Sequence, residues 1–208
     1  MQLTGQVGPN GPVSSGAGTI PVRQGNLGDV IVTELNGRYY EQNVRGNVFT
    51  ACNNAAQALV LVATAAQTGL FLANPTGSGK NFILLEAAWM VDLALTGFTV
   101  VGLSYGPYVA PGGSAFNGPT AATLGSGAAS VAKIGSTLTF ASASTFLRPI
   151  LGCYWVTTGA NAANVGTKDE VAGALIIPPG QAIGFTALTT IATGVGLFTW
   201  AEVNAAVL

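Results

Sequence analysis

Charged residues are scarce in this sequence, and histidine is absent from it. Asp, Glu, Lys and Arg make up 7% of the 208 residues, whereas an ordinary soluble domain carries about 25%. The formal net charge is −1, so the chain lacks a long-range field that would attract nucleic acid or anionic lipid. Because surface charge normally keeps a monomer soluble and unassociated, we expect partner proteins to cover much of this surface.

The absence of histidine removes the commonest general base and the commonest metal ligand. Cys52 and Cys153 lie far apart without C-x-x-C spacing, which excludes a structural zinc site and favours two free thiols. The eight carboxylates are scattered. Glu86 and Asp92 would stand about 20 Å apart on one strand, too far for paired acid–base catalysis. The sequence therefore predicts a non-enzymatic protein with no metal and no cofactor.

Long hydrophobic runs are also missing, although 49% of the residues are apolar. A membrane-spanning helix needs about 20 apolar residues in a row, and the best window, Phe82 to Leu95, is shorter and carries two acids. The start of the chain, MQLTGQVGPNGP, has no basic and apolar regions typical of a secretory signal. We therefore predict assembly in a cytoplasm, without membrane or nucleic-acid partners.

Glycine, by contrast, is abundant, and it marks out the organisation of the chain. Residues 1–28 contain ten Gly or Pro and show neither helical nor strand periodicity, which predicts an extended arm over residues 1–36 that becomes ordered against other subunits. Residues 37–208 are predicted to form one folded domain. It opens with the Arg- and Tyr-rich stretch GRYYEQNVRGNVF, typical of a contact surface. A polar edge strand or loop is the alternative.

Short β-rich runs separated by turn residues fill the rest of the chain, and they predict an antiparallel β-sandwich, specifically an eight-stranded jelly roll. In the run from Phe82 to Leu93 every odd position is apolar, which favours a strand with its odd positions on the core; a helix is the competing interpretation. In the last run, Phe198, Trp200 and Glu202 share one face. The stretch from Gly106 to Gly135 is predicted to be a protruding loop. The predicted strands are Ala58–Thr64, Gly69–Ala73, Phe82–Leu93, Phe98–Tyr105, Thr137–Phe140, Ile150–Thr157, Ala172–Ile177, Ala182–Leu188 and Gly196–Val203.

The stretch LANPTGSGKN contains the core of a phosphate-binding loop, G-x-x-x-x-G-K-[ST]. Asn74 stands where the first glycine is required, and Asn81 stands where the magnesium-binding hydroxyl is required. No apolar strand ends in the Asp that would hold the metal. We therefore predict a turn that joins two strands as a hairpin, with nucleotide binding as a remote alternative.

Four segments carry a resemblance to a protein family: GRYYEQNVRGNVF, FLANPTGSGKNFILLE, IIPPGQAIGFTALT and LFTWAEV. Over most of residues 37–203 the chain resembles small β-sandwich structural proteins of tailed-bacteriophage virions. The resemblance implies a virion component. Our leading hypothesis is a capsid decoration (cement) protein that forms a homo-oligomer, a trimer, and binds the major capsid protein or other virion proteins. The expected anchors are Arg23, Arg38, Tyr39, Tyr40, Arg45 and Phe49.

Two alternatives stay open from the sequence. The first is a tail adaptor or receptor-binding virion protein that uses the stretch from Gly106 to Gly135. The second is an enzyme, either a P-loop nucleotide-binding protein or a carbohydrate-active sandwich.

Overall fold

The computed structural model describes residues 4–7, 18–21, 39–62, 64–92, 99–153, 166–189 and 192–205. The chain divides into two compact units, Met1–Tyr40 and Glu41–Leu208. In the first unit, β1 (Thr4–Val7) and β2 (Gly18–Pro21) pair antiparallel. This pairing lies within the predicted extended arm, where the sequence shows no strand periodicity, because backbone pairing does not require alternating side chains. Two strands of four residues are too short to be stable alone in water, so this hairpin needs further contacts.

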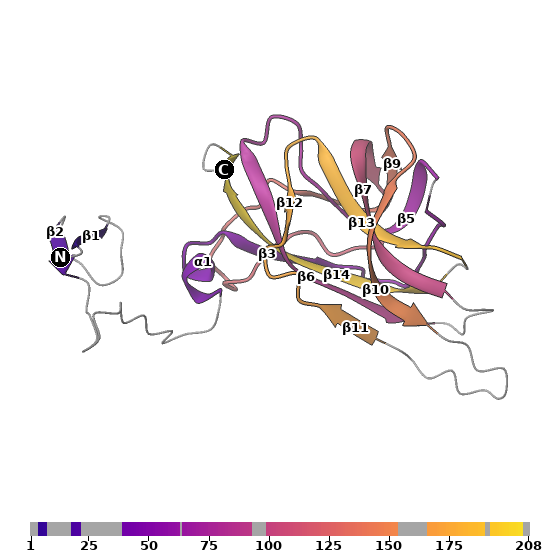
Figure 1. Cartoon of the computed structure of the whole chain (residues 1–208), viewed down its shortest axis with the longest axis horizontal. Coiled ribbons are helices and arrows are strands. Elements are labelled where there is room, and N and C mark those ends of the chain that lie inside the picture. The colour runs from indigo at the N-terminus through magenta and orange to yellow at the C-terminus, as the bar shows by residue number, and fades with distance from the viewer. Residues whose placement is uncertain are drawn as a thin grey trace. The chain divides into compact units, whose positions relative to one another are not determined.

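The second unit is built from two sheets (Figure 1). The larger sheet follows the order β11-β6-β14-β3-β8, with β12 pairing with β6 and β4 pairing with β14. A short helix, α1 (Tyr40–Val44), precedes β3. The strands of this sheet are β3 (Val48–Cys52), β4 (Gln57–Ala58), β6 (Lys80–Val91), β8 (Thr120–Ala121), β11 (Gly166–Asp169), β12 (Leu175–Ile177) and β14 (Thr193–Asn204).

The smaller sheet follows the order β10-β7-β13-β5-β9 and closes on itself. Its long strand β7 pairs with β10 and β13 through its first half and with β9 through its second half. β7, β13, β5 and β9 therefore form a small barrel, with β10 as an edge strand. The strands are β5 (Ala66–Ala73), β7 (Thr99–Gly112), β9 (Lys133–Phe140), β10 (Thr145–Cys153) and β13 (Gln181–Ala187).

The predicted all-β, antiparallel architecture is confirmed. The eight-stranded jelly roll is not confirmed, because there are more strands and one sheet closes into a barrel. β11 lies outside the predicted strands, and of the predicted strand Ala58–Thr64 only Ala58 belongs to a strand, β4. Within the described ranges, no helix is long and apolar enough to span a bilayer.

The β6 strand confirms the strand interpretation, and the predicted core face of odd positions is confirmed only from Leu85 onward. Thr199 of β14 pairs with Glu86, whereas Trp200 pairs with Leu84, so Leu85 forms a bulge. A bulge inserts one extra residue and shifts the alternation of side chains. Before it, the even positions Phe82 and Leu84 are buried; after it, the odd positions 87, 89 and 91 are buried. Both halves of the strand therefore face the core.

The core between the two sheets is dominated by aromatic side chains. Phe185 of the barrel sheet stacks on Phe198 at 4.5 Å between ring centroids and lies 5.1 Å from Trp89. At the other end, Trp200 lies 6.1 Å from Phe49 and 6.4 Å from Phe82. Such ring pairs contribute about 0.5–1.5 kcal/mol beyond the area they bury, so this row of rings joins the sheets.

A second apolar cluster lies among the four barrel strands, centred on Phe71 and Phe140, whose rings meet edge to face at 6.3 Å. Gly184 packs directly on the Phe71 ring: a Cβ at this position would lie 2.1 Å from the ring carbons. The barrel can therefore close around Phe71 because β13 has no side chain at position 184.

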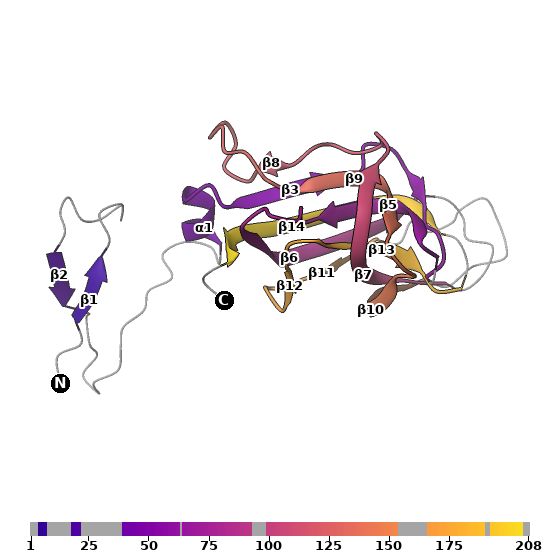
Figure 2. The same ribbon diagram turned by 90° about the horizontal axis from the view of Figure 1, so that it is seen from above.

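The stretch from Gly106 to Gly135 does not protrude as a loop, which corrects the sequence prediction. Its first residues belong to β7, its last to β9, and β8 in its middle pairs with Phe49 and Thr50 of β3 (Figure 2). We call residues 113–132 the cover. The backbone N–H groups of Asn117 and Ala122 donate to Cys52 and Val48 at 2.8 Å each. The cover therefore shields the β3 edge of the larger sheet.

Candidate interaction surface

The turn between β5 and β6 is organised by a buried asparagine. Asn74 is fully buried, and its Nδ2 donates to the carbonyl oxygens of Lys80 and Ile177 at 2.8 Å each. Its Oδ1 accepts a hydrogen bond from Ser78 Oγ at 2.6 Å. Its backbone N–H donates a hydrogen bond to the carbonyl of Gln181, and its carbonyl accepts one from the N–H of Gly180. Asn74 therefore has a structural role, because it joins the turn to β12 and β13.

The predicted hairpin at this turn is wrong, because β5 and β6 belong to different sheets. The turn carries the chain from one sheet to the other. A phosphate loop precedes a helix whose N-terminus faces the phosphates, but Lys80 here begins a strand and its Nζ donates to Asn204 Oδ1 at 2.9 Å. The described residues hold no group of three or more His, Cys, Asp or Glu that could bind a metal ion.

The residues expected to act as anchors have different environments. Tyr39 is half-buried and Tyr40 is 49% exposed, and Arg45, just after α1, is exposed. Phe49 is only 2% exposed and packs against Trp200. Phe49 therefore contributes to the core of its own chain and is not available as a surface anchor. Arg23 and Arg38 lie outside the described residues.

One flank of the larger sheet, which we call the covered flank, is closed by the cover. Glu202 is 4% exposed and shares the inward face with Phe198 and Trp200; the sequence predicted the shared face but not its burial. Its carboxylate accepts hydrogen bonds from Ser130 Oγ, from Val131 N at 3.2 Å and from Trp200 Nε1 at 3.3 Å. A buried carboxylate is tolerated when donors surround it, so Glu202 is the anchor for the end of the cover.

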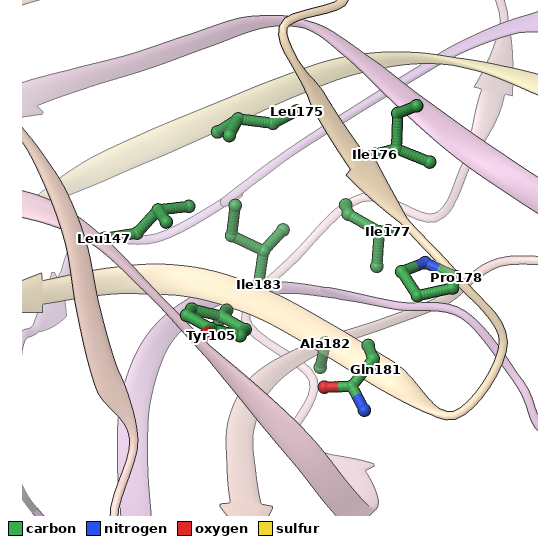
Figure 3. Close-up of a pocket in the computed structure, with 9 residues that line it drawn as sticks. All are labelled: Tyr105, Leu147, Leu175, Ile176, Ile177, Pro178, Gln181, Ala182 and Ile183. Carbon is green, nitrogen blue, oxygen red and sulfur yellow. The ribbon is translucent and has the colours of Figure 1, made fainter.

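The opposite side of the sandwich, which we call the open flank, lies where β10 of one sheet approaches β11 and β12 of the other. Arg148 of β10 and Asp169 of β11 form an ion pair across it, with Nε and Oδ2 3.1 Å apart. Beside this pair is an apolar groove of about 340 Å³. Figure 3 shows its side chains gathered from β7, β10, β12, β13 and the turn at Pro178.

The groove exposes large apolar side chains and contains no charged residue. Ile176 is 45% exposed, Tyr105 42% and Leu147 38%. Gln181 and the Tyr105 hydroxyl supply its polar side-chain groups. An apolar groove with few polar groups is a typical binding site, and this one opens directly to solvent.

A cluster of charged side chains lies on the open flank next to the groove. Lys168 lies 3.2 Å from Glu170 and 3.7 Å from Glu86. The hydrogen bond to Glu170 and the charge of Glu86 raise the pKa of Lys168 above its ordinary value of 10.5. Together with Arg148 and Asp169, these residues form a charged cluster, while Arg45, Lys80, Asp92 and Lys133 lie elsewhere on the described surface.

Sequence reasoning did not identify the groove. Its residues lie on strands whose order in the two sheets depends on the whole fold. One local signal was available: Leu175, Ile176 and Ile177 form an unbroken apolar run, whereas a strand with one solvent face alternates. In β12 the middle residue of that run points to solvent.

Comparisons with protein-family models, curated proteins and solved structures gave no match to this chain. The candidate surface is therefore interpreted from its own geometry.

Proposed function

We propose that this chain is a non-enzymatic structural subunit that works as a homo-oligomer within a larger protein assembly. The observation that carries the proposal is the character of the surface. Large apolar side chains are exposed at several separate places, and charged residues make up only 7% of the chain. A protein that stays monomeric normally spreads charge over its surface and avoids exposed apolar patches.

The rigidity of the second unit supports the same role. An aromatic core joins the two sheets, one sheet closes into a barrel, and the cover protects the β3 edge. Protected edges limit uncontrolled strand pairing between copies. Such a block is suited to specific, repeated contacts in an assembly. Its description as a jelly roll stays a prediction.

We further propose that the assembly is a bacteriophage virion and that the protein acts as a capsid decoration or cement protein. This part rests on the sequence resemblance alone. Trimeric symmetry and binding to the major capsid protein are predictions on the same basis. In this role, many weak contacts per particle would add up through multivalency, with the exposed Tyr40 and Arg45 near the start of the domain among them.

The oligomeric part is tested by the mass of the purified full-length protein in solution. Sedimentation velocity over a hundredfold concentration range is expected to show a species of three copies of the 20.8 kDa chain. A species of one copy at every concentration contradicts the proposal. The virion part is tested by removing residues 1–28: the truncated protein is expected to stay folded and to lose attachment to the particle.

A nucleotide titration separates this proposal from the enzyme alternative. ATP with magnesium is expected to leave the melting temperature of the wild-type protein and of Lys80→Ala unchanged, because Lys80 bonds with Asn204 and begins a strand. A magnesium-dependent rise in the wild type that Lys80→Ala abolishes would instead support nucleotide binding.

A further inference from the structure

The groove on the open flank has the dimensions of a site for a few side chains. Its volume of about 340 Å³ is at the low end of the range of about 300–1,000 Å³ typical of ligand pockets. A folded surface is too blunt to enter such a space, whereas an extended peptide can place alternate side chains in it. The uncharged lining selects an apolar occupant.

Both strands that border the groove have an unpaired edge among the described strands. β12 pairs with β6 alone, and β10 pairs with β7 alone. The free edge of a strand presents backbone N–H and C=O groups that can bind another extended chain. Peptides that add to a sheet edge gain affinity from these groups and specificity from adjacent side-chain pockets. The groove and the edges together fit an extended apolar segment.

The first 38 residues of the chain contain one segment with this character. Val30, Ile31 and Val32 are the only three successive β-branched apolar residues in this part of the sequence, and Leu35 follows shortly after. Such residues favour the extended conformation. In an extended chain Val30 and Val32 point to the same side.

We propose that the segment Val30–Leu35 of a second copy of this chain binds in the groove, an inference that rests on the proposed homo-oligomer. Val30 and Val32 enter the space between Tyr105, Leu147 and Ile176, and the charged Asp29 and Glu34 stay at its ends. The bound segment thereby covers Tyr105, Leu147 and Ile176, the large apolar side chains that the groove exposes.

The position of α1 favours a second copy as the source of the segment. The chain enters the domain on the covered flank, since Thr123 of the cover donates to the carbonyl of Asn43 in α1. Residues 176, 83, 201 and 48 pair in register across β12, β6, β14 and β3. At about 4.8 Å per strand spacing, three spacings put β12 about 14 Å from β3. The five residue steps from Leu35 to Tyr40 span at most about 17 Å, so a copy's own segment can reach the open flank only if it runs straight and nearly fully extended, whereas a neighbour's segment has no such restriction.

A complementation experiment tests the proposal on the full chain. The groove variant carries Leu147→Lys and Ile176→Lys, both at positions that are already partly exposed. The arm variant carries Val30→Asp and Val32→Asp. Val109→Lys is the matched control, because Val109 is 69% exposed and does not line the groove. Circular dichroism checks that each variant is folded, and sedimentation velocity gives its dissociation constant.

Each of the two variants alone is expected to raise the dissociation constant at least tenfold, while Val109→Lys leaves it unchanged. An equimolar mixture of the variants is expected to form heterodimers, because the intact segment of one binds the intact groove of the other. If both variants assemble like the wild type, or if the mixture stays dissociated, the proposal is overturned while the homo-oligomer stands. If the wild type itself is a monomer, the proposed function fails as well.

A peptide with the sequence of residues 28–36, GDVIVTELN, gives an independent measurement that needs no variant. Titrated into the wild-type oligomer, it is expected to dissociate it, and a peptide with both valines replaced by Asp is expected to have no effect. Equal effects of the two peptides, or none from the first, contradict the proposed contact.

Discussion

On the covered flank, residues 113–132 lie along β3 and end at the buried carboxylate of Glu202. On the open flank, β10 and β12 border an apolar groove that no described residue fills. A buried polar side chain contributes to the order of each flank, Glu202 on the first and Asn74 on the second. The described residues thus cover one flank and leave the other exposed. This difference is the basis on which we propose the open flank as the interaction surface.

The largest effect is expected on the covered flank, from Glu202→Ala. The substitution leaves the buried Trp200 Nε1, and also the backbone N–H of Val131, without their acceptor, and it should lower the free energy of unfolding by about 3 kcal/mol. Urea unfolding measures the loss, and limited proteolysis should show faster cleavage within the cover. Asp92→Ala, at an exposed carboxylate, is the control. A loss equal to that of the control means that Glu202 does not anchor the cover.

The next effect is expected on the open flank, from Asn74→Ala. It removes the donors to Lys80 O and Ile177 O and the acceptor of Ser78, so the free energy of unfolding should fall by about 2 kcal/mol. Asn54→Ala serves as the matched control, because Asn54 is exposed and makes one bond to Phe116 O. Hydrogen exchange at β12 should quicken in Asn74→Ala. Unchanged exchange there would show that the asparagine does not hold this strand.

A smaller effect is expected from the ion pair that bridges the open flank. Arg148→Met breaks the contact with Asp169, in which the two side chains are 39% and 16% exposed. Partly exposed pairs contribute up to about 1 kcal/mol. The loss should shrink in 1 M salt, because salt screens the interaction. Unfolding curves at low and high salt measure it, with Lys133→Met as a control at an exposed lysine. Equal losses at both salt concentrations would assign the effect to packing.

The smallest effect is expected from Lys168, which is exposed on the same flank. Glu170 and then Glu86 raise the pKa of Lys168 above 10.5. A raised folded-state pKa of a lysine means that its stabilisation is complete below pH 10.5 and is lost as the pH rises through the folded-state value. Wild type should therefore be slightly more stable than Lys168→Met at pH 8, and the difference should shrink as the pH rises above 10.5. Thermal melts at pH 8 and at rising pH above 10.5 check this, and a difference that grows with pH contradicts it.

The sequence predicted which segments form strands better than it predicted the contacts and surfaces that the strands form. The strand character of β6 was predictable, because alternation of apolar residues is a local property. The bulge at Leu85, which brings Phe82 and Leu84 to the core, was not, because it depends on pairing with Trp200 far along the chain. That Phe198, Trp200 and Glu202 share one face was predicted correctly; that this face is buried, and that Ser130 and Val131 of the cover donate to Glu202, was not.

The candidate surface was less predictable than the fold. The scarcity of charge indicated partner contacts, and the sequence drew attention to the Arg- and Tyr-rich stretch that contains Phe49. The structure puts Phe49 in the core and identifies Tyr105, Leu147 and Ile176 as exposed. Each of these three lies on a different strand, so no segment of the sequence contains the groove.

By itself, the sequence determined that this protein is built of antiparallel strands and that its surface is poor in charge, since periodicity, turn residues and composition are carried by neighbouring residues. The tertiary structure decided which strands share a sheet, that four of them close into a barrel and that one flank stays open. These outcomes require contacts between residues distant in the chain, and such contacts form only when the whole core packs at once.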